Sequence, residues 1–277
     1  MTSTHEIPPA IAPEILAFYG ETIDESERLT STADGMLEMV RTQELLRRHL
    51  PEPPARVLDV GGGPGAHAQW LVEDGYTVHL VDPVPRHIEQ ARETGATVEL
   101  GDARALTADD GTYDAVLVLG PLYHLLQRKE RLQALAEARR VVRPGGLVAA
   151  AAIGRYASLF EHTATTWLGT KQRVRDAVVD ILSTGIHVPG RKGFTAAYFH
   201  TADQLAEEMT TAGLNGVSVY GIEGPAWGAL KAAEQHTGAR LDSDSPLFAS
   251  ALEAARLAEP YPELLSTASH MLAVARA

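Results

Sequence analysis

The stretch VLDVGGGPGA, residues 57–66, decides the fold, because an apolar run leads directly into a glycine-rich loop. The run predicts a buried strand over 56–60, and the residues after the loop predict a helix over 66–74. Glycines permit positive φ angles and let a ligand approach the backbone. The helix N-terminus adds unpaired N–H groups and a partial positive charge. This unit therefore predicts a ligand site for either a carboxylate or a pyrophosphate.

Outward from this unit, apolar runs of strand length alternate with helical patterns. Further strands are predicted over 77–81, 97–100, 113–119 and 147–153, with helices over 87–94 and 129–142. Such alternation is typical of a parallel sheet that helices cover on both faces, with right-handed crossovers. We therefore expect an α/β fold with a doubly wound, mostly parallel, Rossmann-like sheet of about seven strands.

The remaining segments predict helical coverings of this sheet. Residues 1–50 predict an N-terminal helical cap with a main helix over about 36–50, and prolines at 51, 53 and 54 begin the core, 51–154. Residues 155–200 interrupt the alternation and predict a lid with one helix. The core continues over 201–277, with a helix over 202–212, strands over 217–222 and 270–275, and a helical insertion over 224–267.

Composition narrows the function classes. A net charge of −12 disfavours nucleic acid and anionic membranes as partners. The chain has no cysteine, which excludes disulfides and thiolate chemistry, and no metal-binding spacing of histidines, so we predict no metal site. Neither a signal peptide nor a membrane-spanning run is predicted. We expect a cytoplasmic monomer or homodimer that acts on a small molecule.

Two carboxylates follow predicted strands. Asp82, with Pro83 after it, lies about 20 residues beyond the glycine loop, where an acid can accept hydrogen bonds from ribose hydroxyls. Asp102 follows the third strand, where an acid can accept from the exocyclic amine of adenine while the next backbone N–H donates to the ring. Residues 61–66 also fit the dinucleotide pattern G-x-G-x-x-A. The loop alone therefore does not decide between a dinucleotide and another cofactor that contains adenosine.

In order and spacing, these motifs, with YDAV at 113–116 and RPGG at 143–146, resemble those of class I S-adenosylmethionine-dependent methyltransferases over about residues 55–155. The resemblance implies S-adenosylmethionine as cofactor and an antiparallel hairpin of the last two strands. It also implies a set of cofactor-binding residues: Asp59, Gly61, Gly62, Gly63, Gly65, Asp82, Pro83, Gly101, Asp102, Ala103, Leu119 and Gly120.

The residues after the fourth strand are candidates for the reacting end. GPLY at 120–123 is similar to a tetrapeptide of amino-methylating enzymes, but lacks its polar first residue and second proline. Tyr123 can stack on cofactor or substrate. His124 can act as a base, because its ordinary pKa lies near neutrality, or can simply begin a helix.

Segments that we expect to cover the pocket supply further candidates. Arg41 can pair with the cofactor carboxylate, or with Glu44 or Glu38 on its own helix. The candidate substrate contacts are Tyr19, Arg155, Tyr156, Tyr198 and His200.

The sequence thus predicts transfer of a methyl group from S-adenosylmethionine to an O, N or C nucleophile of a small molecule. An NAD-dependent oxidoreductase is one alternative, but none of the four lysines, at 129, 171, 192 and 231, completes a Tyr-x-x-x-Lys pair. A non-catalytic module that binds S-adenosylmethionine is the other. Insertions of lid size favour an enzyme, because a sensor need not exclude water.

Overall fold

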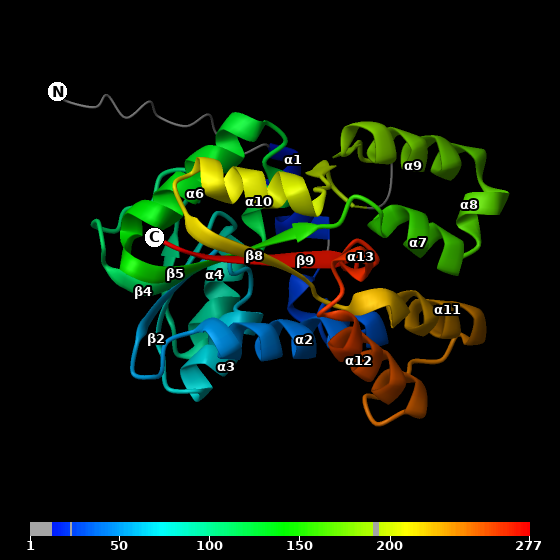
Figure 1. Ribbon diagram of the computed structural model, residues 1–277, viewed down its shortest axis with the longest axis horizontal. Helices are drawn as coiled ribbons and strands as arrows, with labels where there is room; N and C mark the ends of the chain where they lie inside the picture. The colour runs from blue at the N-terminus through cyan, green and yellow to red at the C-terminus, as the bar shows by residue number, and fades with distance from the viewer. Residues whose placement is uncertain (1–12, 23, 191–193) are drawn as a thin grey trace.

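The computed structural model describes residues 13–22, 24–190 and 194–277, and its centre is a seven-stranded sheet (Figure 1). The strands are β1 Arg56–Val60, β2 Thr77–Asp82, β3 Thr97–Leu100, β4 Tyr113–Val118, β5 Val142–Ile153, β8 Asn215–Gly221 and β9 His270–Arg276. Their order is β3-β2-β1-β4-β5-β9-β8. The first five pair in parallel, and β9 runs antiparallel to both β5 and β8. The predicted fold class and the antiparallel pairing of the last two strands are confirmed.

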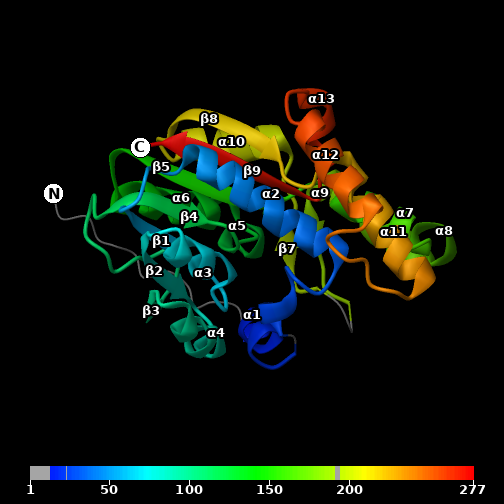
Figure 2. The same cartoon turned by 90° about the horizontal axis from the view of Figure 1, so that it is seen from below.

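Helices cover both faces of the sheet because its central strands are apolar on both sides. One face packs against α2 (Ala33–His49), α3 (Ala66–Glu73) and α4 (Pro85–Ala91), and the other against α6 (Arg128–Val141) and α10 (Ala202–Thr211) (Figures 1 and 2). Side chains of β1 serve both faces of the sheet: Val57 packs in the core under α2, α3 and α4, and Leu58 and Val60 pack in the core under α6 and α10. None of the helices in the described ranges is long and apolar enough to cross a membrane.

The two long insertions lie together beyond the carboxyl ends of the parallel strands. The first holds α7 (Ala157–Ala164), α8 (Trp167–Thr170), α9 (Gln172–Thr184) and a small hairpin, β6 (Ile186–His187) with β7 (Ala197–Tyr198). The second holds η4 (Gly224–Ala226), α11 (Trp227–Thr237), α12 (Pro246–Ala258) and α13 (Pro262–Leu265). Because α11 packs on both α7 and α2, it connects the lid, the second insertion and the cap.

The N-terminal segment lies across the carboxyl edge of the sheet (Figure 2). It consists of α1 (Pro13–Ala17), a π-helical turn η1 (Phe18–Thr22) and a 3-10 turn η2 (Glu25–Glu27). Residues 1–12 of the predicted cap lie outside the described residues. The helix α2 begins at Ala33 instead of about 36, because the Thr32 side chain accepts a hydrogen bond from the Gly35 N–H and caps it.

Arg41 corrects one expectation for the cofactor site. Arg41 is only 1% exposed, and its guanidinium donates to Glu44 and, at 2.7 Å, to Glu259 just after α12. Arg48, about two turns further along α2, donates to the same carboxylate of Glu259. Arg41 therefore faces the second insertion and anchors it to α2.

We expect Glu259→Gln to lower the free energy of unfolding at pH 7 by about 1–3 kcal/mol, because the buried Arg41 guanidinium loses one of its two ionic partners. Hydrogen bonds from Arg48 outweigh burial and lower the pKa of Glu259 to about 2. The contribution is therefore complete above the ordinary pKa of glutamate and is lost as the pH falls toward 2. Urea unfolding from pH 7 down to pH 3 measures it.

Glu253→Gln is the matched control, because that side chain is 60% exposed and lies 3.6 Å from its arginine partner. Equal stability of the two variants at pH 7 would contradict the assigned anchoring role.

Candidate functional site

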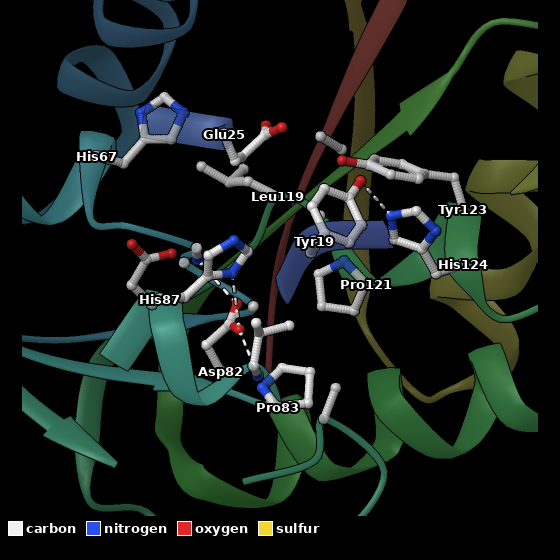
Figure 3. A pocket seen from close by; sticks show the side chains of 18 of the residues that line it. Tyr19, Glu25, His67, Asp82, Pro83, His87, Leu119, Pro121, Tyr123 and His124 are labelled. Atoms are coloured by element: carbon white, nitrogen blue, oxygen red, sulfur yellow. Dashed lines mark hydrogen bonds and ion pairs between the residues drawn. The ribbon is translucent and has the colours of Figure 1, made fainter. Parts of the chain in front are cut away.

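A cavity of about 210 Å³ opens where the glycine loop meets the carboxyl ends of β1, β2 and β4 (Figure 3). Among the predicted residues, those lining it are Tyr19, Asp59, Gly61, Gly62, Gly63, Asp82, Pro83, Gly101, Asp102, Ala103, Leu119, Gly120, Tyr123 and His124. Gly65 does not line it. A Cβ there would meet Thr94 Cγ2 at 2.6 Å, so Gly65 serves the packing of α3.

Three glycines in a row make the floor of this cavity, each for a different reason. A Cβ on Gly61 would meet Pro121 Cγ at 2.5 Å, and one on Gly62 would meet Asp59 Oδ2 at 2.6 Å. At Gly63, by contrast, the nearest atom to a Cβ would be 3.9 Å away, although its φ of +58° is in the left-handed region. The space above Gly63 is therefore left to a ligand.

Asp59 lies fully buried beneath the loop, and neither of its carboxylate oxygens has a hydrogen-bond partner within the described ranges. Burial, with the nearby charge of Asp82, raises the pKa of Asp59 to about 7. An unpaired buried carboxyl is costly, and the cost falls when a ligand supplies a cation or an N–H donor. The unpaired Asp59 carboxyl therefore fits a cationic ligand, such as S-adenosylmethionine with its ammonium and sulfonium groups.

Asp82 holds the loop and the second strand together. Its Oδ2 accepts from the Gly63 N–H at 2.9 Å, while its Oδ1 accepts from the Val84 N–H at 2.9 Å and lies 3.0 Å from His87 Nδ1. Nothing in the sequence marks His87 as a cavity residue, because it is one residue on an ordinary helix, α4. Each carboxylate oxygen can accept more than one hydrogen bond, so Asp82 keeps capacity toward a ligand.

Asp102 also lines the cavity, shortly after β3. Arg104 donates to it three ways: backbone N–H to Oδ1 at 2.8 Å, Nε at 3.1 Å and Nη2 to Oδ2 at 2.7 Å. The buried Arg104 also pairs with Glu130 at 2.7 Å. This ion-pair chain orients the Asp102 carboxylate at the cavity wall, and the sequence reasoning did not anticipate it.

Sequence reasoning also missed a chain of ion pairs that reaches the cavity through Arg28, Glu38 and His270. Arg28 donates to both oxygens of Glu38, at 2.8 and 3.1 Å, and His270 Nδ1 lies 3.6 Å from Glu38 and 2.5 Å from Glu223. Burial lowers the pKa of His270, but the two carboxylates outweigh it and raise the pKa to about 9. Potential ligand atoms of Glu38, Glu223 and His270 lie within 4.8 Å of one another, yet a protonated imidazole donates and does not ligate.

Tyr19 and His124 form a hydrogen-bonded pair at the mouth of the cavity, with 2.8 Å between the phenol oxygen and Nε2 (Figure 3). Tyr19 comes from η1 and His124 from α5 (Pro121–His124), the turn after β4. Burial raises the pKa of Tyr19 well above its usual range and lowers the pKa of His124 to about 4. Both groups are therefore uncharged at neutral pH.

A second cavity of about 880 Å³ continues from the first, between the lid, α2 and α11. The two cavities share five lining residues: Tyr19, Arg28, Glu38, Tyr123 and His270. The Tyr19–His124 pair thus lies at the junction of the smaller cavity and the larger one. This arrangement suits two ligands that meet at the junction.

Four predicted substrate contacts line neither cavity. Arg155 donates to the Phe199 carbonyl and to Gln204, the Tyr198 ring lies 3.8 Å from the Arg131 guanidinium, and the buried His200 lies 3.3 Å from Glu208. These contacts join the C-terminal part of the lid to α6 and α10. Tyr156 is 38% exposed outside both cavities. For all four residues, the structure thus corrects the sequence-based expectation that they line the pocket.

Comparison with known proteins agrees with this geometry. Residues 57–146 match the model of a methyltransferase domain family. Residues 57–146 therefore form a class I, S-adenosylmethionine-dependent methyltransferase domain. The ubiquinone biosynthesis O-methyltransferase of Methylocella silvestris is 34% identical over 137 residues, which cover 46% of this chain and 52% of that protein.

One further curated protein and one solved structure are also similar to this chain. The glycine/sarcosine N-methyltransferase of Halorhodospira halochloris is 32% identical over 139 residues, which cover 47% of this chain and 48% of that protein. The structure of a Thermotoga maritima S-adenosylmethionine-dependent methyltransferase, described as a possible histamine N-methyltransferase, matches with a TM-score of 0.58 at 19% identity. That match covers 95% of this chain and 99% of the other, and shows the shared fold. The chain spans about half the length of the curated relatives it matches.

In the methyltransferase domain without ligand, we expect Asp59→Asn to gain stability over the wild type as the pH rises. The folded pKa of about 7 lies above the ordinary aspartate value, so ionised Asp59 opposes folding. That penalty is absent below about pH 4, grows as the pH rises to 7 and is constant above. The difference in unfolding free energy between pH 4 and pH 8 is about 2–4 kcal/mol.

Urea unfolding of both proteins at several pH values measures this difference. Asp244→Asn, in an exposed loop, is the control and should show no such trend. A pH-independent difference for Asp59→Asn would show that its carboxyl titrates normally.

Proposed function

We propose that the chain transfers the methyl group of S-adenosylmethionine to a hydroxyl group of a small molecule. The observation that carries the proposal is the unpartnered Asp59 carboxyl beneath a bare glycine floor, in a cavity that joins a larger one at Tyr19 and His124. The first cavity suits the cofactor, and the second suits the acceptor.

Bound S-adenosylmethionine supplies an activated methyl group on a sulfonium. In this proposal, Asp59 faces the ammonium group, and the N-terminus of α3 with the glycine loop takes the carboxylate. Asp82 receives the ribose hydroxyls, and Asp102 with the Ala103 N–H receives the adenine. The same arrangement argues against a dinucleotide, because a pyrophosphate over the loop would lie above the buried Asp59 carboxylate.

The Tyr19–His124 pair supports a hydroxyl acceptor. A hydroxyl oxygen becomes strongly acidic as it gains a carbon substituent, so a neutral imidazole with a pKa of about 4 can accept its proton. A methylated amine is far less acidic and would keep its proton against such a base. In this role His124 is the base, and Tyr19 orients it and the acceptor through the 2.8 Å hydrogen bond.

The size and cover of the second cavity support a small acceptor. A volume of about 880 Å³ is within the usual range for small-molecule sites. Residues of the lid and of the second insertion line it, so these segments can limit the access of water to an acceptor bound there. A cytoplasmic monomer or homodimer without nucleic-acid partners stays a prediction from composition.

We expect Gly63→Ala to weaken the binding of S-adenosylhomocysteine at least 10-fold, because the added methyl enters the space that the ligand would fill. Gly238→Ala is the matched control: its φ is +69°, so the backbone strain is similar, but nothing lies within 4 Å of the added Cβ. Isothermal titration calorimetry measures both. Equal affinities would place the cofactor away from the loop, and no binding by the wild type would refute the proposed function.

We expect His124→Ala to lower kcat about 100-fold, in the range found for loss of a general base, and Tyr19→Phe to lower it about 10-fold. The affinity for S-adenosylhomocysteine should change less than two-fold in each. Because the pKa of His124 is about 4, kcat should not fall between pH 8 and pH 6. The assay uses radiolabelled S-adenosylmethionine with a metabolite extract, and later with the purified acceptor.

Tyr261→Phe, on a 58% exposed side chain, is the control for the phenol substitution. A kcat limb with a midpoint near pH 6.5 that disappears in His124→Ala would contradict the lowered pKa. An unchanged kcat in His124→Ala would remove it from the reaction.

A further inference from the structure

One wall of the larger cavity carries a charged cluster that the methyl-transfer chemistry does not use. Lys231 of α11 donates to Asp34 Oδ2 at 2.9 Å and lies 3.8 Å from Glu161 Oε1. Asp34 belongs to α2 and Glu161 to α7, so the cluster joins cap, lid and insertion. All three side chains line the larger cavity and none lines the cofactor cavity.

Two polar atoms of this wall are unsatisfied. Asp34 Oδ1 and His162 Nδ1 are buried and have no hydrogen-bond partner in the parts of the chain that the structure describes. His162 also lines the cavity, where its ring stacks on Trp167 with centroids 5.8 Å apart and planes 21° apart. Buried polar atoms are nearly always paired in folded proteins, so an unpaired acceptor next to a cavity marks a place where a ligand supplies the donor.

The charges select the kind of ligand group. Within the cluster, two carboxylates and one ammonium sum to a charge of −1, and although burial lowers the pKa of Lys231, Asp34 and Glu161 outweigh it and raise that pKa. Lys171 and Arg173 also line the cavity, so charges of both signs face a ligand there. An anionic group would meet both carboxylates, and a cationic group would compete with Lys231 for the same oxygens. A neutral hydroxyl avoids both conflicts, because it donates to a carboxylate and accepts from the ammonium.

The position of the cluster relates it to the reacting junction. Asp34 and Glu38 are one turn apart on α2, which places their Cβ atoms about 5–6 Å apart. Glu38 lines both cavities, so hydroxyls held at Asp34 lie about one helical turn from the junction. The rest of the larger cavity is mainly apolar and aromatic, with Ile153, Ala157, Phe194, Phe199 and Trp227 in its lining.

We propose that Asp34, Lys231 and Glu161, with His162, bind adjacent hydroxyls of a sugar-like ring, and that the methyl acceptor is such a ring carried on an apolar body. This inference rests on the proposed function, since it concerns the molecule that receives the methyl group. The three charged residues are binding residues, and Tyr19 and His124 keep the roles given above.

The test compares matched pairs of ligands on the wild-type chain saturated with S-adenosylhomocysteine. The probes are aromatic O-glucosides of flavonol and naphthol size and the corresponding aglycones, titrated by calorimetry. At least one glucoside should bind 10-fold or more tightly than its aglycone. Asp34→Asn and Lys231→Met should each remove that difference while leaving the affinities for the aglycone and for S-adenosylhomocysteine within two-fold.

Matched controls come from exposed side chains without assigned partners. Asp244→Asn and Lys129→Met carry the same chemical changes away from the cluster and should keep the preference for the glucoside. Because Lys231→Met leaves Asp34 without its ionic partner, thermal unfolding is measured alongside. Asp34→Asn leaves Lys231 beside Glu161 and therefore tests the proposed binding site independently.

Three results would overturn the assignment: no glucoside binds, glucosides bind no better than aglycones, or the variants weaken both ligands equally, as a purely structural bridge would. Failure of the proposed function is distinguishable, because then S-adenosylhomocysteine itself does not bind. If it binds and labelled methyl groups appear only on products without a hydroxylated ring, the methyltransferase proposal stands and this inference falls.

Discussion

The site depends on how closely side chains can approach the backbone at residues 61 and 62. Pro121 can lie against Gly61, and Asp59 can lie beneath Gly62, only because neither glycine carries a Cβ. The first contact fixes the start of α5 and therefore the positions of Tyr123 and His124. The second leaves a buried carboxyl under the loop to which none of the described residues donates a hydrogen bond. Cofactor recognition and placement of the base thus follow from one steric constraint at the end of β1.

Ion pairs across distant segments complete the walls. Arg28, Glu38, His270 and Glu223 come from the N-terminal turn, α2, β9 and the end of β8, and each charge meets an opposite one. Such partly buried pairs add little net stability, because desolvation offsets much of the attraction. Removing one partner is costly, however, so the network holds these four segments in one arrangement. That arrangement keeps the N-terminal segment, and with it Tyr19, over the junction.

Local patterns account for what sequence reasoning could predict. Strand and helix periodicity, the glycine loop, Asp82 and Asp102 lie within a contiguous stretch whose spacing is set by the sheet itself, and the structure places them around one cavity. Arg41, Arg155 and His200 line neither cavity, because each pairs with a group that is distant in the sequence or is placed by the way the lid folds back. Arg28 and His87 were missed for the same reason: nothing near them in the chain marks them as cavity residues.

The division between the two cavities follows the division of the chain. The cofactor cavity is built mainly from residues 57–146, the part that matches the methyltransferase domain family. The larger cavity is built mainly from the cap, the lid and α11, which that match does not reach. Its walls contact the cofactor cavity only through shared residues such as Tyr19 and Glu38. Changes in the insertions can therefore alter which acceptor is held while leaving the loop, Asp59 and Asp82 undisturbed, since the energetic coupling between the two sets passes through those few shared side chains.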